Sequence, residues 1–142
     1  MEKGHSDTTT HGIRVRAAAE LVPEHSDADR PLHFYRYRII LSNEGTAPAK
    51  LVSRHWIIRD ANNEMEEVRG AGVVGEQPEI APGENFQYES SCPLKTSWGT
   101  MEGNYQMLRP SGERFEAKIG RFFLAPTVAP LSKLGSKRSR AR

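Results

Sequence analysis

The sequence predicts an all-β protein, a β-sandwich of about seven or eight short antiparallel strands. Three observations carry this prediction. Apolar residues recur at every second position in short runs, turn residues separate the runs, and no stretch has the length and periodicity of a capped helix. A period of two is typical of strands with one face in a core and the other in water, so the two sheets are expected to enclose one core.

Six runs alternate apolar and polar residues, and each is expected to form a strand. They cover residues 13–19, 35–41, 52–58, 86–92, 101–107 and 115–119. Turn residues separate them at 43–45, 60–63, 81–83 and 110–112, and the last group predicts a hairpin. The alanines that end the first run favour a helix, but Pro23 leaves too few residues to nucleate one.

Two aromatic residues indicate a sandwich of the immunoglobulin or fibronectin type III kind. Trp56 lies in the third predicted strand, where such folds bury a tryptophan. Tyr105 lies in a late strand, where a tyrosine hydroxyl often bonds back to the backbone. Cys92 is the single cysteine, so the chain cannot form the internal disulfide of an antibody domain, and its core must hold the fold.

The composition fits one soluble domain between two polar ends. The chain has 142 residues, of which 37% are hydrophobic and 27% charged. We expect a disordered tail over residues 1–12, the sandwich over 13–128 and a basic, disordered tail over 129–142. No apolar run approaches the roughly 20 residues of a membrane span, and the N-terminus lacks the apolar centre of a signal peptide. A cytoplasmic protein without a membrane span is therefore expected.

The formal net charge of +2 conceals an uneven distribution. Residues 131–142 contain five basic and no acidic residues, whereas the other 130 residues contain 15 basic and 18 acidic ones. A nucleic-acid-binding domain would carry its basic surface on the folded body. Nucleic acid is therefore disfavoured as a partner, except for weak binding through the basic tail.

No arrangement of side chains predicts catalysis. Cys92 continues the alternation of its run, so we interpret it as a small core residue rather than a nucleophile. His55 is expected on the strand face opposite Trp56, and the nearest histidine in sequence is His33 on a different run. Because a metal needs convergent ligands, His55 is interpreted as a structural residue. We expect no catalytic residue, no metal site and no cofactor.

The segment RGAGVVGEQP, residues 69–78, contains the spacing G-x-G-x-x-G at Gly70, Gly72 and Gly75. In dinucleotide-binding folds this motif opens a helix whose N-terminal amides bind phosphate, but the prolines that follow exclude a helix here. Glutamates outnumber the single arginine between residues 64 and 79, which disfavours a bare anion. A phosphate that arrives with Mg²⁺ would meet less opposition.

Three interpretations of this segment remain open. It is a structural turn that needs positive φ, a loop that contacts a partner protein, or a site for an anion or a metal-bound phosphate. The candidate binding residues under the last two interpretations are Arg69, Gly70, Gly72, Gly75 and Glu76.

Several stretches together resemble the bacterial ApaG family. They are SRHW at 53–56, EVRGAGVVGEQP at 67–78, SCPL at 91–94 and GTMEGNYQM at 99–107, within a resemblance that covers about residues 12–127. The resemblance implies an immunoglobulin or fibronectin type III-like sandwich. It also implies a link to cobalt and magnesium efflux, a pyrophosphate site at the glycines and a relation to substrate-recruiting regions of F-box proteins. The basic tail departs from the family pattern.

These observations predict a non-enzymatic binding module with an unknown protein partner, linked indirectly to cobalt and magnesium homeostasis. The alternative is binding of magnesium pyrophosphate or a nucleotide at the glycine-rich segment, with slow hydrolysis. Exposed sheet edges also allow a homodimer.

Overall fold

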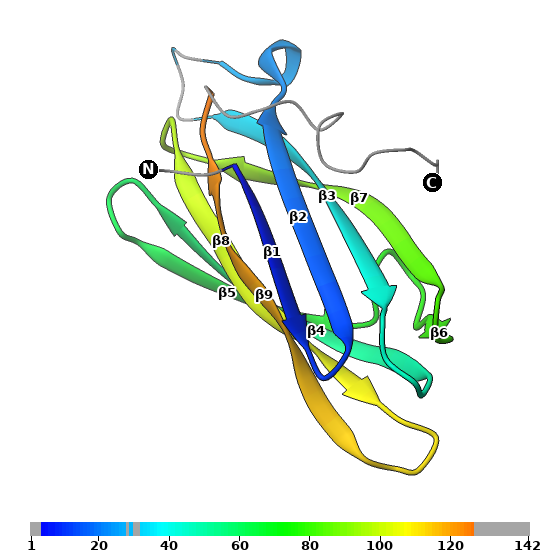
Figure 1. Cartoon of the computed structure of the whole chain (residues 1–142). Coiled ribbons are helices and arrows are strands. Elements are labelled where there is room, and N and C mark those ends of the chain that lie inside the picture. The colour runs from blue at the N-terminus through cyan, green and yellow to red at the C-terminus, as the bar shows by residue number, and fades with distance from the viewer. Residues whose placement is uncertain (1–3, 28, 30–31, 127–142) are drawn as a thin grey trace.

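All six alternating runs form strands in the computed structural model, which describes residues 4–27, 29 and 32–126 (Figure 1). These strands are β2 (Ile13–Leu21), β3 (His33–Asn43), β4 (Ala49–Asp60), β7 (Asn85–Leu94), β8 (Gly99–Leu108) and β9 (Arg114–Leu124). The alanines belong to β2, and Pro23–His25 form a short 3-10 turn, η1. The alternation therefore predicted the type of these elements correctly.

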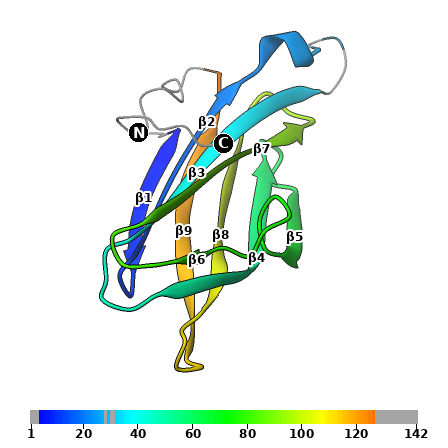
Figure 2. The same ribbon diagram turned by 90° about the vertical axis from the view of Figure 1, so that its right-hand side faces the viewer.

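Three further strands lack a clear apolar alternation. They are β1 (His5–Thr10), β5 (Met65–Ala71) and the two-residue β6 (Glu79–Ile80). Strands β1, β2, β3 and β7 form one antiparallel sheet in that order, and β5, β4, β8 and β9 form the other, with β6 beside β4. The two sheets face each other, so the predicted β-sandwich is confirmed (Figure 2).

The expectation that residues 1–12 are disordered is wrong for β1. A two-residue turn at His11 and Gly12, with φ of 49° and 84°, folds β1 back along β2. The strand also bonds to the opposite sheet, because the Ser6 hydroxyl donates to the Gly120 carbonyl at 2.7 Å. These polar contacts hold a strand that has no apolar face, which is why the periodicity missed it. The predicted tail over residues 129–142 lies outside the described residues.

The core centres on Trp56, which is almost completely buried between the sheets. Its ring centroid lies 5.4 Å from that of Tyr37, 6.4 Å from Tyr105 and 6.1 Å from Phe122, all in tilted or edge-to-face contact. Such aromatic pairs contribute about 0.5–1.5 kcal/mol each beyond the area that they bury. The prediction that Trp56 is a core residue is confirmed.

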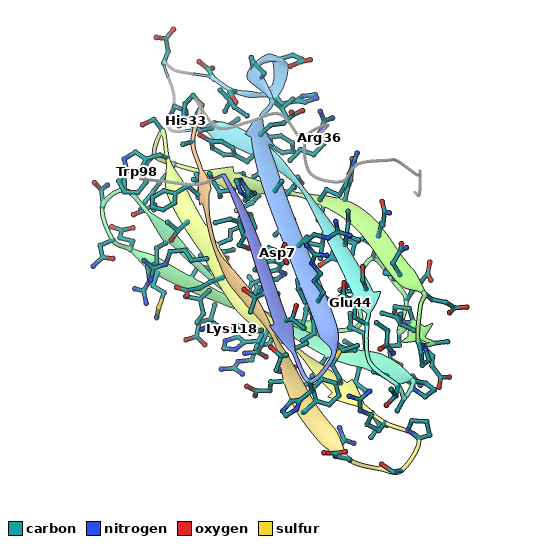
Figure 3. The ribbon with its side chains drawn as sticks, in the orientation of Figure 1. Asp7, His33, Arg36, Glu44, Trp98 and Lys118 are labelled. Carbon is teal, nitrogen blue, oxygen red and sulfur yellow. The ribbon has the colours of Figure 1, made fainter. Side chains whose placement is uncertain are left out.

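The sandwich is closed along one side and open along the other. On the closed side β1 lies against β9, where the Lys118 amide donates to the Thr10 hydroxyl at 3.2 Å; Figure 3 labels Asp7 on β1 and Lys118 on β9. On the open side the outermost strands are β7 in one sheet and β5, with the short β6, in the other. The glycine-rich segment begins in β5 and so lies on the open side (Figure 2).

Candidate functional site

The five residues predicted to form one binding loop belong to two different elements. Arg69 and Gly70 lie within strand β5, paired with His55 and Arg54 of β4. The expectation that they belong to a loop is wrong, because this part of the chain continues the β4–β5 ladder. The other three predicted residues, Gly72, Gly75 and Glu76, lie in the connection between β5 and β6.

The connection is a tight turn over residues 73–76, which we call the glycine turn. The Val73 amide donates to the Glu76 carbonyl and the Glu76 amide donates to the Val73 carbonyl, both at 2.8 Å. The two central residues, Val74 and Gly75, have φ of 43° and 84°. Positive φ at both central positions is the geometry of a type I′ turn, which joins antiparallel segments with the correct twist.

Gly72 and Gly75 are glycines for different reasons. At Gly72, with φ of 60°, a Cβ would lie 2.1 Å from the Glu76 carbonyl oxygen, so a side chain has no room. At Gly75 nothing lies within 4 Å of the Cβ position, and only the φ of 84° favours glycine. The motif spacing thus serves the turn itself, in agreement with the interpretation as a structural turn.

Gly70 makes room for a guanidinium group. A Cβ at Gly70 would lie 2.9 Å from the guanidinium of Arg54, its partner across the β4–β5 ladder. From this position Arg54 donates to the carbonyl of Ala71 at 3.1 Å and to that of Gly72 at 2.9 Å. One side chain of β4 therefore ties the end of β5 to the start of the glycine turn.

A bulge in β4 provides a second anchor. The register of β4 against β8 shifts between Leu51 and Ser53. The carbonyl of Val52, at the bulge, accepts from the Gly72 amide and from the side-chain amide of Gln77, both at 2.8 Å. The glycine turn is thus bonded to β4 on both of its sides, and its geometry is fixed before any ligand arrives.

The two valines of the turn point in opposite directions. Val73 is 1% exposed and belongs to the core, whereas Val74 is 55% exposed at the tip. A β-branched residue at positive φ is a genuine outlier, since its Cβ substituents crowd the backbone. The fold therefore holds an apolar side chain in water at a position that Asn, Asp or Gly would fill with less strain.

Three backbone amides of this segment already have partners within the protein. Those of Gly72, Val73 and Glu76 donate to carbonyl groups of the protein. Within β5, Glu67 contacts His55 at 3.3 Å and Arg69 at 3.1 Å, and these two bonds lower the pKa of the Glu67 carboxyl. Arg69 is thus partly neutralised by its own neighbour. The Gly72, Val73 and Glu76 amides are therefore not free to bind an anion.

Three other predicted residues lie away from the turn. Cys92 is buried, which raises the pKa of its thiol to about 12, and its interpretation as a core residue is confirmed. His33 lies in the other sheet from His55, so the two do not converge. Tyr105 is buried, and its hydroxyl bonds to the hydroxyl of Tyr88 at 2.5 Å rather than to the backbone as predicted.

The described residues hold no group of three or more His, Cys, Asp or Glu side chains placed to bind a metal ion. Among the same residues, no helix has the length and apolar character needed to cross a membrane.

Sequence reasoning missed Arg54 and Val74. Arg54 stands in β4, and only the pairing of β4 with β5 brings its guanidinium over Gly70. The position of Val74 could have been predicted from the sequence. If the turn is of type I′, the valine directly before the last glycine of the motif must take the first central position.

The comparisons with known proteins agree with this architecture. The family model described as the ApaG domain, DUF525, matches residues 23–109. Protein ApaG of Dechloromonas aromatica is 51% identical over 120 residues, which are 84% of this chain and 94% of that protein. Protein ApaG of Bradyrhizobium diazoefficiens is 50% identical over 115 residues, 81% of this chain and 88% of that one.

Two solved structures share this fold, one at high and one at low sequence identity. A crystal structure of an ApaA protein from Bordetella pertussis matches with a TM-score of 0.79 and 41% identity, over 89% of this chain and 98% of that chain. The C-terminal domain of wzt matches with a TM-score of 0.53 and 10% identity, which shows a shared fold alone. From the matching family model and relatives of about half-identical sequence, the chain belongs to the ApaG domain family.

Proposed function

We propose that this protein is a non-enzymatic module that binds a protein partner through the glycine turn, with Val74 as the central contact. The observation that carries the proposal is the conformation and exposure of Val74, at φ 43° and 55% exposed. Backbone strain of this kind costs about 1–3 kcal/mol and persists where the surrounding structure enforces it. Neither the strain nor the exposed valine stabilises the fold, so both fit a contact surface.

The anchoring of the turn supports the same proposal. Arg54, the buried Val73 and the carbonyl of Val52 fix the turn from three sides. A preformed contact loses less conformational entropy on binding than a flexible loop does. Val74 is 55% exposed, so a partner that covers the rest of its side chain would gain about 1 kcal/mol from burial.

A protein-binding function also fits the expected fold type, the expected location in the cytoplasm and the expected indirect link to cobalt and magnesium. Loops of immunoglobulin or fibronectin type III-like sandwiches, the kind of fold that we infer from the sheet order, commonly carry recognition. The free, buried thiol of Cys92 suits the cytoplasm, where we place the protein. Any effect on cobalt or magnesium levels would then pass through the bound partner.

A pair of matched variants tests the proposal. Val74→Asn should relieve strain and stabilise the fold, because Asn-Gly is the preferred type I′ pair, yet it should weaken partner binding. His11→Asn is the control, since His11 holds the same position, at φ 49°, in the β1–β2 turn. Wild type and both variants would be immobilised. The proteins that each one captures from a lysate of the source organism would then be quantified.

We expect at least one protein to be captured by wild type and by His11→Asn but captured in smaller amount by Val74→Asn. Equal capture by all three would reject Val74 as the contact. In a parallel titration with magnesium pyrophosphate, binding that persists in Val74→Asn and raises the melting temperature would favour the phosphate site instead.

A further inference from the structure

Strand β5 forms a regular free edge of its sheet. Of the strands among the described residues it pairs with β4 alone, in unbroken register from Ser53 opposite Ala71 to Arg59 opposite Met65. Its seven residues contain no proline, and Figure 2 shows the strand at the border of the sandwich. Unpaired edges of this kind are templates for another strand.

The hydrogen bonds at both ends of the β4–β5 ladder reveal which backbone groups face outward. The Asp60 amide donates to the Glu64 carbonyl at 3.1 Å, and the Gly72 amide donates to the Val52 carbonyl at 2.8 Å. Since hydrogen-bonded and non-bonded pairs alternate in an antiparallel ladder, the even-numbered residues of β5 bond to β4. The outward amides and carbonyls belong to Met65, Glu67, Arg69 and Ala71.

We propose that this edge pairs with the same edge of a second copy of the chain, antiparallel, about a two-fold axis at Val68. Val68 is the middle residue of β5, so the two strands overlap over their full length. All outward backbone groups then meet outward groups of the partner subunit, with Met65 opposite Ala71 of the partner subunit. The two β4–β5 sheets become one continuous sheet.

Charge selects this register. It places Glu67 of each copy opposite Arg69 of the partner subunit, on the outer face of the sheet, so the arrangement contains this favourable pair twice. A shift of the two-fold axis by one residue would place Glu67 opposite Glu67 of the partner subunit, or Arg69 opposite its own copy. Like charges directly opposite each other are destabilising.

The inner face of the strand offers a second complementary pair. The same register places Glu66 opposite Gly70 of the partner subunit, and the guanidinium that lies over each Gly70 is that of Arg54. Among the described residues no carboxylate forms an ion pair with Arg54, and no basic group forms one with Glu66. Glu66 of each copy would therefore meet Arg54 of the partner subunit.

Charged residues on an edge strand also commonly serve to prevent pairing. The arrangement in β5 differs from a uniform charge because it is self-complementary in one register. One pair of strands buries a small area, at the low end for specific interfaces, so the dimer should be weak and form reversibly. The dimer does not depend on the protein partner proposed for the glycine turn.

Sedimentation of the full chain from about 10 μM to 1 mM tests the pairing. Wild type should shift from monomer to dimer over this range. Glu67→Arg places arginines opposite each other and Arg69→Glu places glutamates opposite each other, so each variant alone should dimerise at least about tenfold more weakly. Both substitutions are on the surface, and circular dichroism would confirm that each variant folds.

An equimolar mixture of the two variants provides the decisive result. In the mixture one copy carries arginine at both positions and the other carries glutamate at both, so the heterodimer should form at least as well as the wild-type dimer. Wild type that remains monomeric at 1 mM would overturn the proposal. So would a dimer that both single variants retain, or a mixture that associates no better than its components.

Discussion

The hydroxyl groups of Tyr88 and Tyr105 lie 2.5 Å apart inside the core and join the two sheets of the sandwich. Tyr88 belongs to β7 and Tyr105 to β8. Burial is the first cause that raises the pKa of both hydroxyls, so both stay protonated at neutral pH and one donates to the other. A hydrogen bond between two buried polar groups is costly to break from one side only.

A double-mutant cycle should therefore show strong coupling between these tyrosines. Tyr88→Phe or Tyr105→Phe leaves one buried hydroxyl without this partner and should lower the free energy of unfolding by about 1–3 kcal/mol. The double variant should lose less than the sum of the two single losses. Urea unfolding of the four proteins measures the coupling, and strictly additive losses would contradict the bond.

Cys92 should contribute to unfolding at alkaline pH. Burial raises the pKa of its thiol from 9.0 to about 12 in the folded chain, so the folded state retains the proton after the unfolded state has lost it. The stability from the protonated thiol is complete below pH 9 and is lost as the pH rises towards 12.

Removal of the thiol should flatten the alkaline limb of the stability curve. Between pH 9 and 10.5 the free energy of unfolding of Cys92→Ala should decline less steeply than that of wild type. The difference in slope should be up to about 1.4 kcal/mol per pH unit. The difference in stability between Cys92→Ala and wild type at pH 7 is the baseline, because it includes the cost of the smaller side chain. Parallel curves for the two proteins from pH 8 to 10.5 would show that Cys92 does not titrate in this way.

The glycines of the turn should differ in their tolerance of alanine. Gly75→Ala adds a methyl group in open space and should cost about 1–2 kcal/mol for the left-handed backbone alone. Gly72→Ala should cost clearly more, because its Cβ would lie 2.1 Å from the Glu76 carbonyl oxygen. Chemical unfolding ranks the two variants, and equal losses would contradict the turn geometry.

Arg54→Lys should loosen the glycine turn without unfolding the sandwich. A lysine has one ammonium group in place of the planar guanidinium, so it cannot bond to the Ala71 and Gly72 carbonyls in the same geometry. We expect faster hydrogen exchange at the Gly72 and Val73 amides, with unchanged exchange at Tyr105 in β8. Unchanged exchange at all three amides would show that Arg54 does not hold the turn.

The sequence was sufficient for the elements that bury an apolar face. The alternation around Trp56 and Tyr105 predicted both strands and both core positions, because one face of each strand must leave water. β1 escaped prediction because its stability comes from polar contacts such as that of Ser6 with Gly120, which join residues far apart in sequence. Pairing, rather than composition, makes it a strand.

The candidate site could be predicted only in part. The spacing of Gly72 and Gly75 indicated a turn with positive φ, and the following prolines excluded a phosphate-binding helix. The assignment of Gly70 to the loop was wrong, because its partner Arg54 is distant in sequence and is brought over it by the ladder. Periodicity within one strand carries no information about such cross-strand contacts.

The most direct measurement of the central claim is the change in amide chemical shifts of the ¹⁵N-labelled protein when the partner captured by wild type is added. The proposed function predicts that the largest shifts occur at Val74 and Gly75 and that they are smaller in Val74→Asn. It also predicts no shift at these amides with millimolar magnesium pyrophosphate. Shifts at these amides with magnesium pyrophosphate, or partner-induced shifts confined to other strands, would contradict the claim.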